Sequence, residues 1–439
     1  MGRAVQARAR AVDPRGALST GHPRPGTHGV LVRVIGWAGR GASALLLAAL
    51  TLVAVPAAPS AAAADDPDCD NVQTETEERK VEGVNDANDA LHVGEATALL
   101  ARRGIGPGEG VRIVVVDSGI TGHDGSGPST LDYAHGLTAA GIIAGPDQDD
   151  PGVEVGIAPA ATVEGRTFYT HPRGSDDGVT PTSDGLATAL RGVADDRSAG
   201  RLPPRTIVLV PIEVAHSTAL ESAVDRLVRT GVLVVAAGGD RPAPESGFLP
   251  SYSGEAEPGE DAARDVWPAA DDRTLAVGAS TDGALGSVLR SSAIDVAAPG
   301  TGAVSRGLNG GWCRVTSVSS HWAAAQVAGI AALVWSANGD ESATRIRARL
   351  VTTASGNTLG ASPLVGHGVV QALEALERVP STGRSDRDED TTARPADAPR
   401  ARADVLAPTR ERAIWWGLGG GGALAVLLIL RPVLARRRR

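Results

Sequence analysis

The stretch SSHWAAAQVAGIAALV, residues 319–334, is the most informative segment of this 439-residue chain. After its first three residues it is almost entirely apolar, and it is rich in alanine, the residue with the highest helix propensity. The stretch therefore predicts a helix that carries His321 near its start. What a histidine means at this place depends on two segments nearer the N-terminus.

Short β-branched runs alternate with helical stretches through the middle of the chain. The run at 111–116 ends at Asp117, and similar runs at 207–210 and 232–236 have a helical stretch at 220–228 between them. Such apolar strands are typical of a mainly parallel sheet covered on both faces. The predicted fold class is therefore α/β, with Asp117 at the carboxyl end of a strand, where such sheets place their sites.

His135 opens a second informative stretch, HGLTAAGIIAG at residues 135–145. Its closely spaced small residues allow a helix to pack tightly behind an imidazole. Taken singly, each residue has an ordinary explanation, because aspartate is common in turns and histidine at a helix start is commonly structural. The order Asp117, His135, then the helix at 319–334 is more specific than any one of the three.

In that order the three segments resemble the DTG, HGTxVAG and GTSxAAP blocks of the subtilisin family of serine peptidases. The resemblance covers roughly residues 104–376. It implies a subtilisin-like three-layer fold in which Asp117 and His135 are the catalytic acid and base. Further blocks that match are GIAP at 156–159, WPA at 267–269, LAVGA at 275–279 and DVAAPG at 295–300.

The same resemblance exposes three departures. His321 stands where the family has its nucleophilic serine, and an imidazole does not form the ester intermediate in that geometry. Asp240 stands where the family has the oxyanion-hole asparagine, a donor whose loss alone costs about 10²–10³ in rate. Pro211 removes a backbone donor from the strand that would pair with a substrate. We therefore expect a pseudopeptidase.

Three alternatives stay open at this stage. Ser319 or Ser320 would be the nucleophile of a working endopeptidase if one residue were inserted before Val327, and each position turns a helical side chain by about 100°. His135, His321 and Asp240 would bind Zn²⁺, with Asp117 on the far nitrogen of His135. The chain would otherwise be a secreted binding protein unrelated to secretion machinery. Apart from the zinc alternative, no cofactor is expected.

The two ends of the chain carry targeting signals. The apolar run at 42–55 follows Arg33 and Arg40 and precedes small residues up to position 64, which is typical of a secretory signal peptide. The uncharged apolar run at 413–430 is near the minimum for crossing about 30 Å of hydrocarbon. Arginines follow it, and basic residues stay cytoplasmic. These features predict a single-pass protein with its large domain outside.

Two cysteines, Cys69 and Cys313, are an even number in an exported chain. A disulfide is expected between the N-terminal extension and the loop before His321, with free thiols as the alternative. The formal charge is −9 although both termini are rich in arginine, so the exported part is more acidic than the total. This balance argues against a nucleic-acid partner.

The whole arrangement resembles the mycosins, membrane-anchored peptidases that accompany the type VII secretion systems of actinobacteria. The resemblance implies a type VII secretion membrane complex as partner, a C-terminal helix in the cell membrane, an extracytoplasmic domain and a cytoplasmic tail. The predicted regions are a signal peptide region (1–64), an N-terminal extension (65–103), a subtilisin-like peptidase domain (104–379), a disordered linker (380–412), a transmembrane helix (413–430) and a basic tail (431–439).

Overall fold

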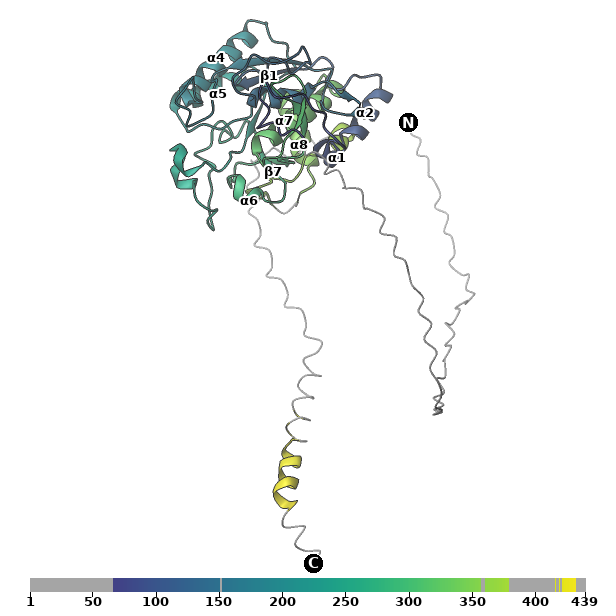
Figure 1. The fold of residues 1–439 in the computed structure, drawn as a ribbon, viewed down its shortest axis with the longest axis vertical. Helices are drawn as coiled ribbons and strands as arrows, with labels where there is room; N and C mark the ends of the chain where they lie inside the picture. The colour runs from purple at the N-terminus through teal and green to yellow at the C-terminus, as the bar shows by residue number, and fades with distance from the viewer. Residues whose placement is uncertain are drawn as a thin grey trace, which may run out of the picture. The chain divides into compact units, whose positions relative to one another are not determined.

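The computed structural model of the chain describes residues 66–150, 152–356, 360–378, 415, 418 and 421–431 (Figure 1). The chain divides into two units, Met1–Ala63 and Ala64–Arg439, and all described residues belong to the second unit. The predicted signal peptide region and the predicted linker at 380–412 lie outside the described residues, as does the basic tail apart from Arg431.

A six-stranded sheet forms the centre of the domain, with the strand order β4-β1-β5-β6-β7-β8. Every neighbouring pair of its strands is parallel. The strands predicted at 111–116, 207–210 and 232–236 correspond to β1, β5 and β6, which confirms the predicted α/β class with a mainly parallel sheet. The strands are β1 (Arg112–Asp117), β4 (Thr162–Thr167), β5 (Thr206–Val210), β6 (Leu233–Ala237), β7 (Leu275–Ala279) and β8 (Val296–Ala298).

Alternate side chains of the strands feed two apolar layers, because successive residues of a strand point to opposite faces. Val114 and Val208 pack with α4 (Ser183–Ser198) and α5 (Thr218–Val228). On the other face, Ile113 and Ile207 pack with the larger set of helices. Figure 1 shows α4 and α5 on one side of the sheet and α7 and α8 on the other. The second set comprises α3 (His135–Ala144), α7 (Ser320–Ala337), α8 (Ala343–Thr353) and α9 (Ala372–Glu377).

Glycines allow α3 and α7, the two helices that carry the histidines, to lie close to neighbouring segments of the chain. A Cβ atom at Gly136 would lie 2.4 Å from the carbonyl oxygen of Gly119 and 2.9 Å from a carboxylate oxygen of Asp117. A Cβ atom at Gly329 would lie 2.9 Å from that of Ile157. A larger residue at position 136 would push α3 away from the carboxyl end of β1, and one at position 329 would push α7 away from Ile157.

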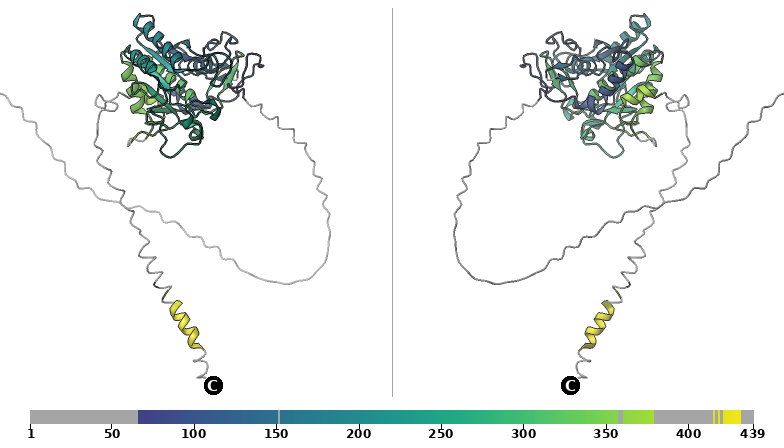
Figure 2. Two further views of the ribbon diagram at one scale, coloured as in Figure 1. Left: turned by 90° about the vertical axis from the view of Figure 1, so that its left-hand side faces the viewer. Right: turned by 90° about the vertical axis from the view of Figure 1, so that its right-hand side faces the viewer.

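The N-terminal extension packs into the same core as the sheet. Its helices are α1 (Asp86–Ala90) and α2 (Val93–Arg102), and Leu91 and Leu100 are fully buried in the layer that contains α7. The views of Figure 2 show these helices, in purple, beside the light green C-terminal helices of the domain, and α2 contacts α9. The extension is therefore an integral part of the domain.

A disulfide joins Cys69 of the extension to Cys313, with the two Cα atoms 4.9 Å apart. Cys313 lies in β10 (Trp312–Arg314), which pairs antiparallel with β9 (Val304–Arg306). The expected position of Cys313 in a loop was wrong, because the sequence has no alternating apolar pattern across this short strand. The remaining elements are β2 (Gln148–Asp149), β3 (Gly152–Val153), α6 (Ala284–Ser287) and the 3₁₀ turns η1 (Pro244–Ser246) and η2 (Pro250–Tyr252).

The described residues nearest the C-terminus, Trp415, Leu418 and residues 421–431, are helical. They belong mainly to the predicted membrane span at 413–430, whose other residues lie outside the described part of the chain. None of the helices in the described part is long and apolar enough to cross a membrane. The transmembrane helix stays a prediction.

A candidate active site with two histidines

Asp117 is the last residue of β1, and its side chain is fully buried. Its carboxylate accepts hydrogen bonds from the backbone N–H of Ser118 at 2.7 Å and from the hydroxyl of Tyr169 at 2.8 Å. Both carboxylate oxygens lie 3.0 Å from Nδ1 of His135. Burial works against the negative charge, but His135 and the other donors outweigh it, so the pKa of Asp117 lies below its ordinary value.

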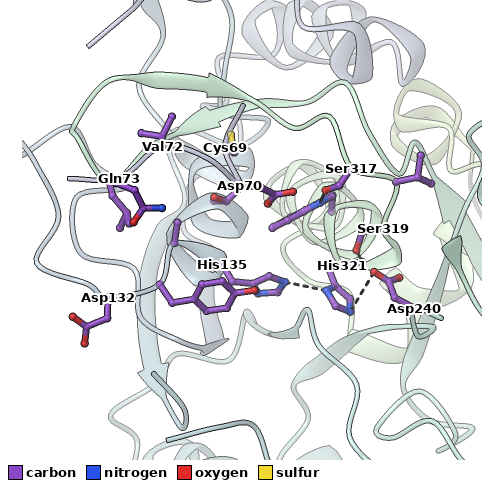
Figure 3. A pocket seen from close by; sticks show the side chains of 16 residues that line it. Cys69, Asp70, Val72, Gln73, Asp132, His135, Asp240, Ser317, Ser319 and His321 are labelled. Atoms are coloured by element: carbon purple, nitrogen blue, oxygen red, sulfur yellow. Dashed lines mark hydrogen bonds and ion pairs between the residues drawn. The ribbon is translucent and has the colours of Figure 1, made fainter. Parts of the chain in front are cut away.

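His135 is the first residue of α3, and its ring lies between two aromatic side chains. Tyr133 stacks on it with ring centroids 5.8 Å apart, and Trp322 lies at 4.8 Å. In the tautomer that donates from Nδ1 to Asp117, Nε2 carries a lone pair and can accept a hydrogen bond. That Nε2 is 2.9 Å from Nδ1 of His321 (Figure 3).

His321 lies in the first turn of α7 and has carboxylates on its other side. Its Nε2 is 2.7 Å from Oε2 of Glu213 and 3.7 Å from Oδ2 of Asp240. Burial lowers the pKa of His321, but the charges of Asp240 and Glu213 outweigh burial and raise it to about 9. At neutral pH His321 is therefore an imidazolium that donates from Nδ1 to His135 and from Nε2 to Glu213.

Glu213 follows β5 and extends the chain of contacts to Arg173. Its side chain is buried, and Oε1 accepts a hydrogen bond from Nη1 of Arg173 at 3.1 Å. Burial raises the pKa of Glu213, but His321 and Arg173 lower it to about 2. Asp117, His135, His321, Glu213 and Arg173 form a continuous series of contacts, which we call the five-residue array.

Asp240, which the resemblance predicts at the oxyanion position, bonds to the start of α7. Its Oδ1 accepts hydrogen bonds from the backbone N–H of Ser320 at 2.8 Å and from the Ser320 hydroxyl at 2.7 Å. A negative charge is favourable at the N-terminal end of a helix. The carboxylate thus fixes the helix start next to His321 and offers no hydrogen to a developing oxyanion.

The two serines before His321 use their hydroxyls within the structure. The Ser319 oxygen accepts the backbone N–H of His321 at 2.9 Å, as the N-cap of α7. The Ser320 hydroxyl is fully buried, donates to Asp240 and accepts from the Gly239 N–H at 3.1 Å. In the described part of the chain, the hydrogen bonds of His135 go to Asp117, Tyr169 and His321. Neither serine takes the place that a nucleophile would need.

Backbone groups of the segment after β5, where the resemblance predicts pairing with a substrate, form hydrogen bonds within the chain. Val214 and Trp267 exchange two backbone hydrogen bonds, at 2.9 and 3.0 Å, and the carbonyl oxygen of Glu213 accepts from Arg173. Pro211, in the same segment, has no N–H to donate. These backbone groups are therefore already paired and do not offer themselves to a peptide.

A cavity of about 330 Å³ opens beside the two histidines (Figure 3). The N-terminal extension forms one wall of this cavity. The residues around it that matter for the site are Cys69, Asp70, Val72 and Gln73 of the extension together with His135, Asp240, His321 and Trp322.

The zinc alternative gains no support from this geometry. Both nitrogens of His321 are occupied by hydrogen bonds, and Nε2 of His135 faces one of them at 2.9 Å. Among the residues that the structure describes, no group of three or more His, Cys, Asp or Glu side chains is placed to hold a metal ion.

Three residues of the site were not predicted as members of it: Glu213, Arg173 and Tyr169. Glu213 was noticed only as part of the stretch after β5, and its contact with His321 joins residues 108 positions apart. The one available signal was that a charged residue, Glu213, comes shortly after a buried strand and Pro211. That signal did not indicate which residue Glu213 would contact.

The pKa of His321 predicts a loss of stability in mild alkali. It is about 9 in the folded chain against an ordinary 6.5, so its stabilising contribution is complete below pH 6.5 and lost as the pH rises through 9. Since one pKa unit corresponds to about 1.4 kcal/mol and the pKa rises from 6.5 to about 9, we expect the free energy of unfolding to fall by about 3–4 kcal/mol. Urea titrations between pH 6 and pH 10 measure it. The variant His321→Asn should lack this fall, and an equal fall in the variant would contradict the assignment.

The model of the subtilase family matches residues 108–368, which confirms the predicted subtilisin-like fold. Mycosin-4 of Mycobacterium tuberculosis is 29% identical over 371 residues, which cover 75% of this chain and 78% of that protein. Alkaline elastase YaB of a Bacillus species is 29% identical over 290 residues, covering 61% of this chain and 65% of that one.

Two solved structures have a similar fold. Crystalline MycP1 with its N-terminal propeptide removed has a TM-score of 0.52 and 22% identity, over 66% of this chain and 97% of that one. A chain in the periplasmic assembly from the ESX-5 inner membrane complex has a TM-score of 0.54 and 21% identity, over 77% of this chain and 94% of that one. At these identities the likeness concerns the fold.

Proposed function

Since the chain belongs to the subtilase family, we propose that it is a mycosin-like pseudopeptidase that serves type VII secretion by binding and does not hydrolyse peptides. The observation that carries this proposal is the 2.9 Å contact between Nε2 of His135 and Nδ1 of His321. In a serine peptidase the same Nε2 removes the proton of the attacking hydroxyl. Here its lone pair is occupied by the N–H of an imidazolium.

The rest of the site supports the same reading. Asp117 and His135 keep the geometry of an acid and base pair, but a base without a nucleophile has no acyl group to transfer. The carboxylate of Asp240 opposes the negative charge that an acyl-transfer transition state develops. Catalytic groups act as a unit, so loss of the nucleophile removes most of the benefit of the others.

The proposed partner is a type VII secretion membrane complex. This part of the proposal is supported by the likeness to mycosin-4 over most of both chains and by the fold shared with a chain of the ESX-5 periplasmic assembly. The proposed location is the cell membrane, with the span at 413–430 as anchor and the subtilase domain on the extracytoplasmic side. Cross-linking of the full chain in native membranes should recover secretion-complex subunits. Recovery of unrelated exported proteins instead would favour the secreted-binder alternative.

A fluorophosphonate probe tests the loss of peptidase chemistry. We expect no covalent adduct on the full chain at pH 7.5 under conditions that label alkaline elastase completely, because among the described residues His135 bonds to Asp117, Tyr169 and His321 and to no serine hydroxyl. Peptide mapping locates any adduct. An adduct on Ser319 or Ser320 would mean that one of these hydroxyls leaves its present partner, and the working-endopeptidase alternative would then replace the proposal.

A further inference from the structure

The five-residue array has a fixed number of hydrogens. Its first three contacts join Asp117 to His135 at 3.0 Å, His135 to His321 at 2.9 Å and His321 to Glu213 at 2.7 Å. Each contact requires one hydrogen between its two heavy atoms. The two rings have four nitrogens, and three hydrogens satisfy all three contacts, with Nε2 of His135 left as the acceptor.

Any other proton count breaks a contact. A fourth hydrogen, on Nε2 of His135, would place two N–H groups face to face at 2.9 Å. Removal of one hydrogen would leave a ring lone pair facing either the carboxylate of Glu213 or the other imidazole. The observed arrangement therefore belongs to one protonation state of the pair.

We propose that the contact between His135 and His321 is a pH-sensitive latch, closed at neutral pH and opened in acid when a second proton binds to His135. The proposal goes beyond the proposed function and does not depend on whether the chain hydrolyses peptides. The open state separates the two rings and leaves a charged N–H of His135 facing the cavity.

The groups around His135 act in opposite directions on this second proton. Asp117, from β1, attracts it, and the imidazolium of His321, from α7, repels it. Tyr169, in the segment after β4, has its hydroxyl 3.1 Å from Nδ1 of His135. Burial, and then the charge of the nearby Asp117, raise the pKa of Tyr169 well above its ordinary value. Burial and the charge of Asp117 raise the pKa of Tyr133, so this ring stays neutral. Trp322, which packs against His135, carries no charge either. The charged groups in contact with His135 are therefore Asp117 and His321, while the carboxylates of Asp70, Asp132 and Asp240 line the same cavity.

The surroundings of His321 provide a place for it to move. Glu213 and Asp240 both face Nε2, at 2.7 and 3.7 Å, while Arg173 lies on the far oxygen of Glu213. A small rotation toward Asp240 would keep the imidazolium between two carboxylates as it leaves His135. Because the pKa of His321 is about 9, its own proton stays in place throughout the acid range.

Opening of the latch would alter the cavity. Both rings line the cavity of about 330 Å³, which the extension closes on one side. In acid the wall of the cavity would carry one more positive charge. The cavity would also extend into the space that opens between the two separated rings. Any partner group bound there would then experience a different surface at neutral and acid pH.

The latch is tested by NMR of the full chain with ¹⁵N-labelled histidine rings, titrated from pH 8 to pH 4.5. At neutral pH we expect one ring protonated on both nitrogens and a scalar coupling across the N–H···N contact to a second ring. The coupling should vanish in the same step in which Nε2 of His135 becomes protonated. Persistence of the coupling after that step, or no protonation of His135 down to pH 4.5, would overturn the proposal.

Two variants make the test specific. His321→Asn removes the repelling cation, so the protonation midpoint of His135 should rise by about one pH unit or more. Asp240→Asn keeps His321 but removes its second carboxylate, so the midpoint should fall. The matched control is His216→Asn, at an exposed histidine 3.3 Å from Glu221, and it should leave the midpoint unchanged. An unchanged midpoint in both site variants would contradict the latch, and folding of each is read from the dispersed spectrum.

Discussion

The double variant His321→Ser with Asp240→Asn is expected to react with a fluorophosphonate at position 321, whereas the wild-type chain does not. Removal of the imidazolium frees Nε2 of His135, which Asp117 still orients from 3.0 Å. The new hydroxyl would stand at the start of α7, beside that lone pair. The amide of an asparagine at position 240 would restore a donor where Asp240 now has a carboxylate.

Two further variants show how much of the reactivity depends on each substitution. His321→Ser alone should react about 10²–10³ times more slowly than the double variant, because it lacks the oxyanion donor. His321→Ala with Asp240→Asn should not react, since it has no hydroxyl at that position. Labelling of the double variant is compared at equal folded fraction, measured by circular dichroism. A folded but unreactive double variant would show that the base has been lost as well as the nucleophile.

Glu213→Ala is expected to cause the largest loss of stability among single changes in the site. Glu213 is buried between two cations, with His321 at 2.7 Å and Arg173 at 3.1 Å. Removal of one partner from a buried ion pair costs about 3–5 kcal/mol, because the remaining charge stays buried without compensation. Denaturant unfolding, with the midpoint and slope fitted separately, measures the loss.

The matched control is Glu221→Ala, at an exposed carboxylate that also pairs with a histidine. Glu221 lies 3.3 Å from His216, and both side chains are about half exposed. Exposed pairs of this kind contribute about 0–1 kcal/mol. A cost for Glu213→Ala no larger than that for Glu221→Ala would mean that His321 is neutral, and the charge assignment of the array would be wrong.

The fold was largely predictable because its signals are local. Runs of β-branched residues at 111–116, 207–210 and 232–236 are the strands β1, β5 and β6, and the stretch 319–334 lies almost wholly in α7. The close packing behind His135 was indicated by glycines at the required spacing. Cys313 was misplaced because three-residue strands carry too little pattern to be recognised.

The site was only partly predictable because its decisive contacts are long-range. The facing of His321 and His135 was expected from the resemblance, and the structure places them 2.9 Å apart. The resemblance gave no indication that Glu213 and Arg173 continue the array, since these residues belong to no shared block. The bonding of Asp240 to Ser320 was also missed, because the comparison with an asparagine directed attention to the cleft and away from the helix start.

The burial of the N-terminal extension has a consequence for maturation. A zymogen releases its prosegment because the two parts are separately folded and weakly joined. Here Leu91 and Leu100 belong to the same apolar layer as α7, and the disulfide from Cys69 to Cys313 holds the cavity wall to β10. Cleavage near residue 103 would expose core side chains and leave the fragment covalently attached. After such a cleavage the extension would therefore remain attached to the domain.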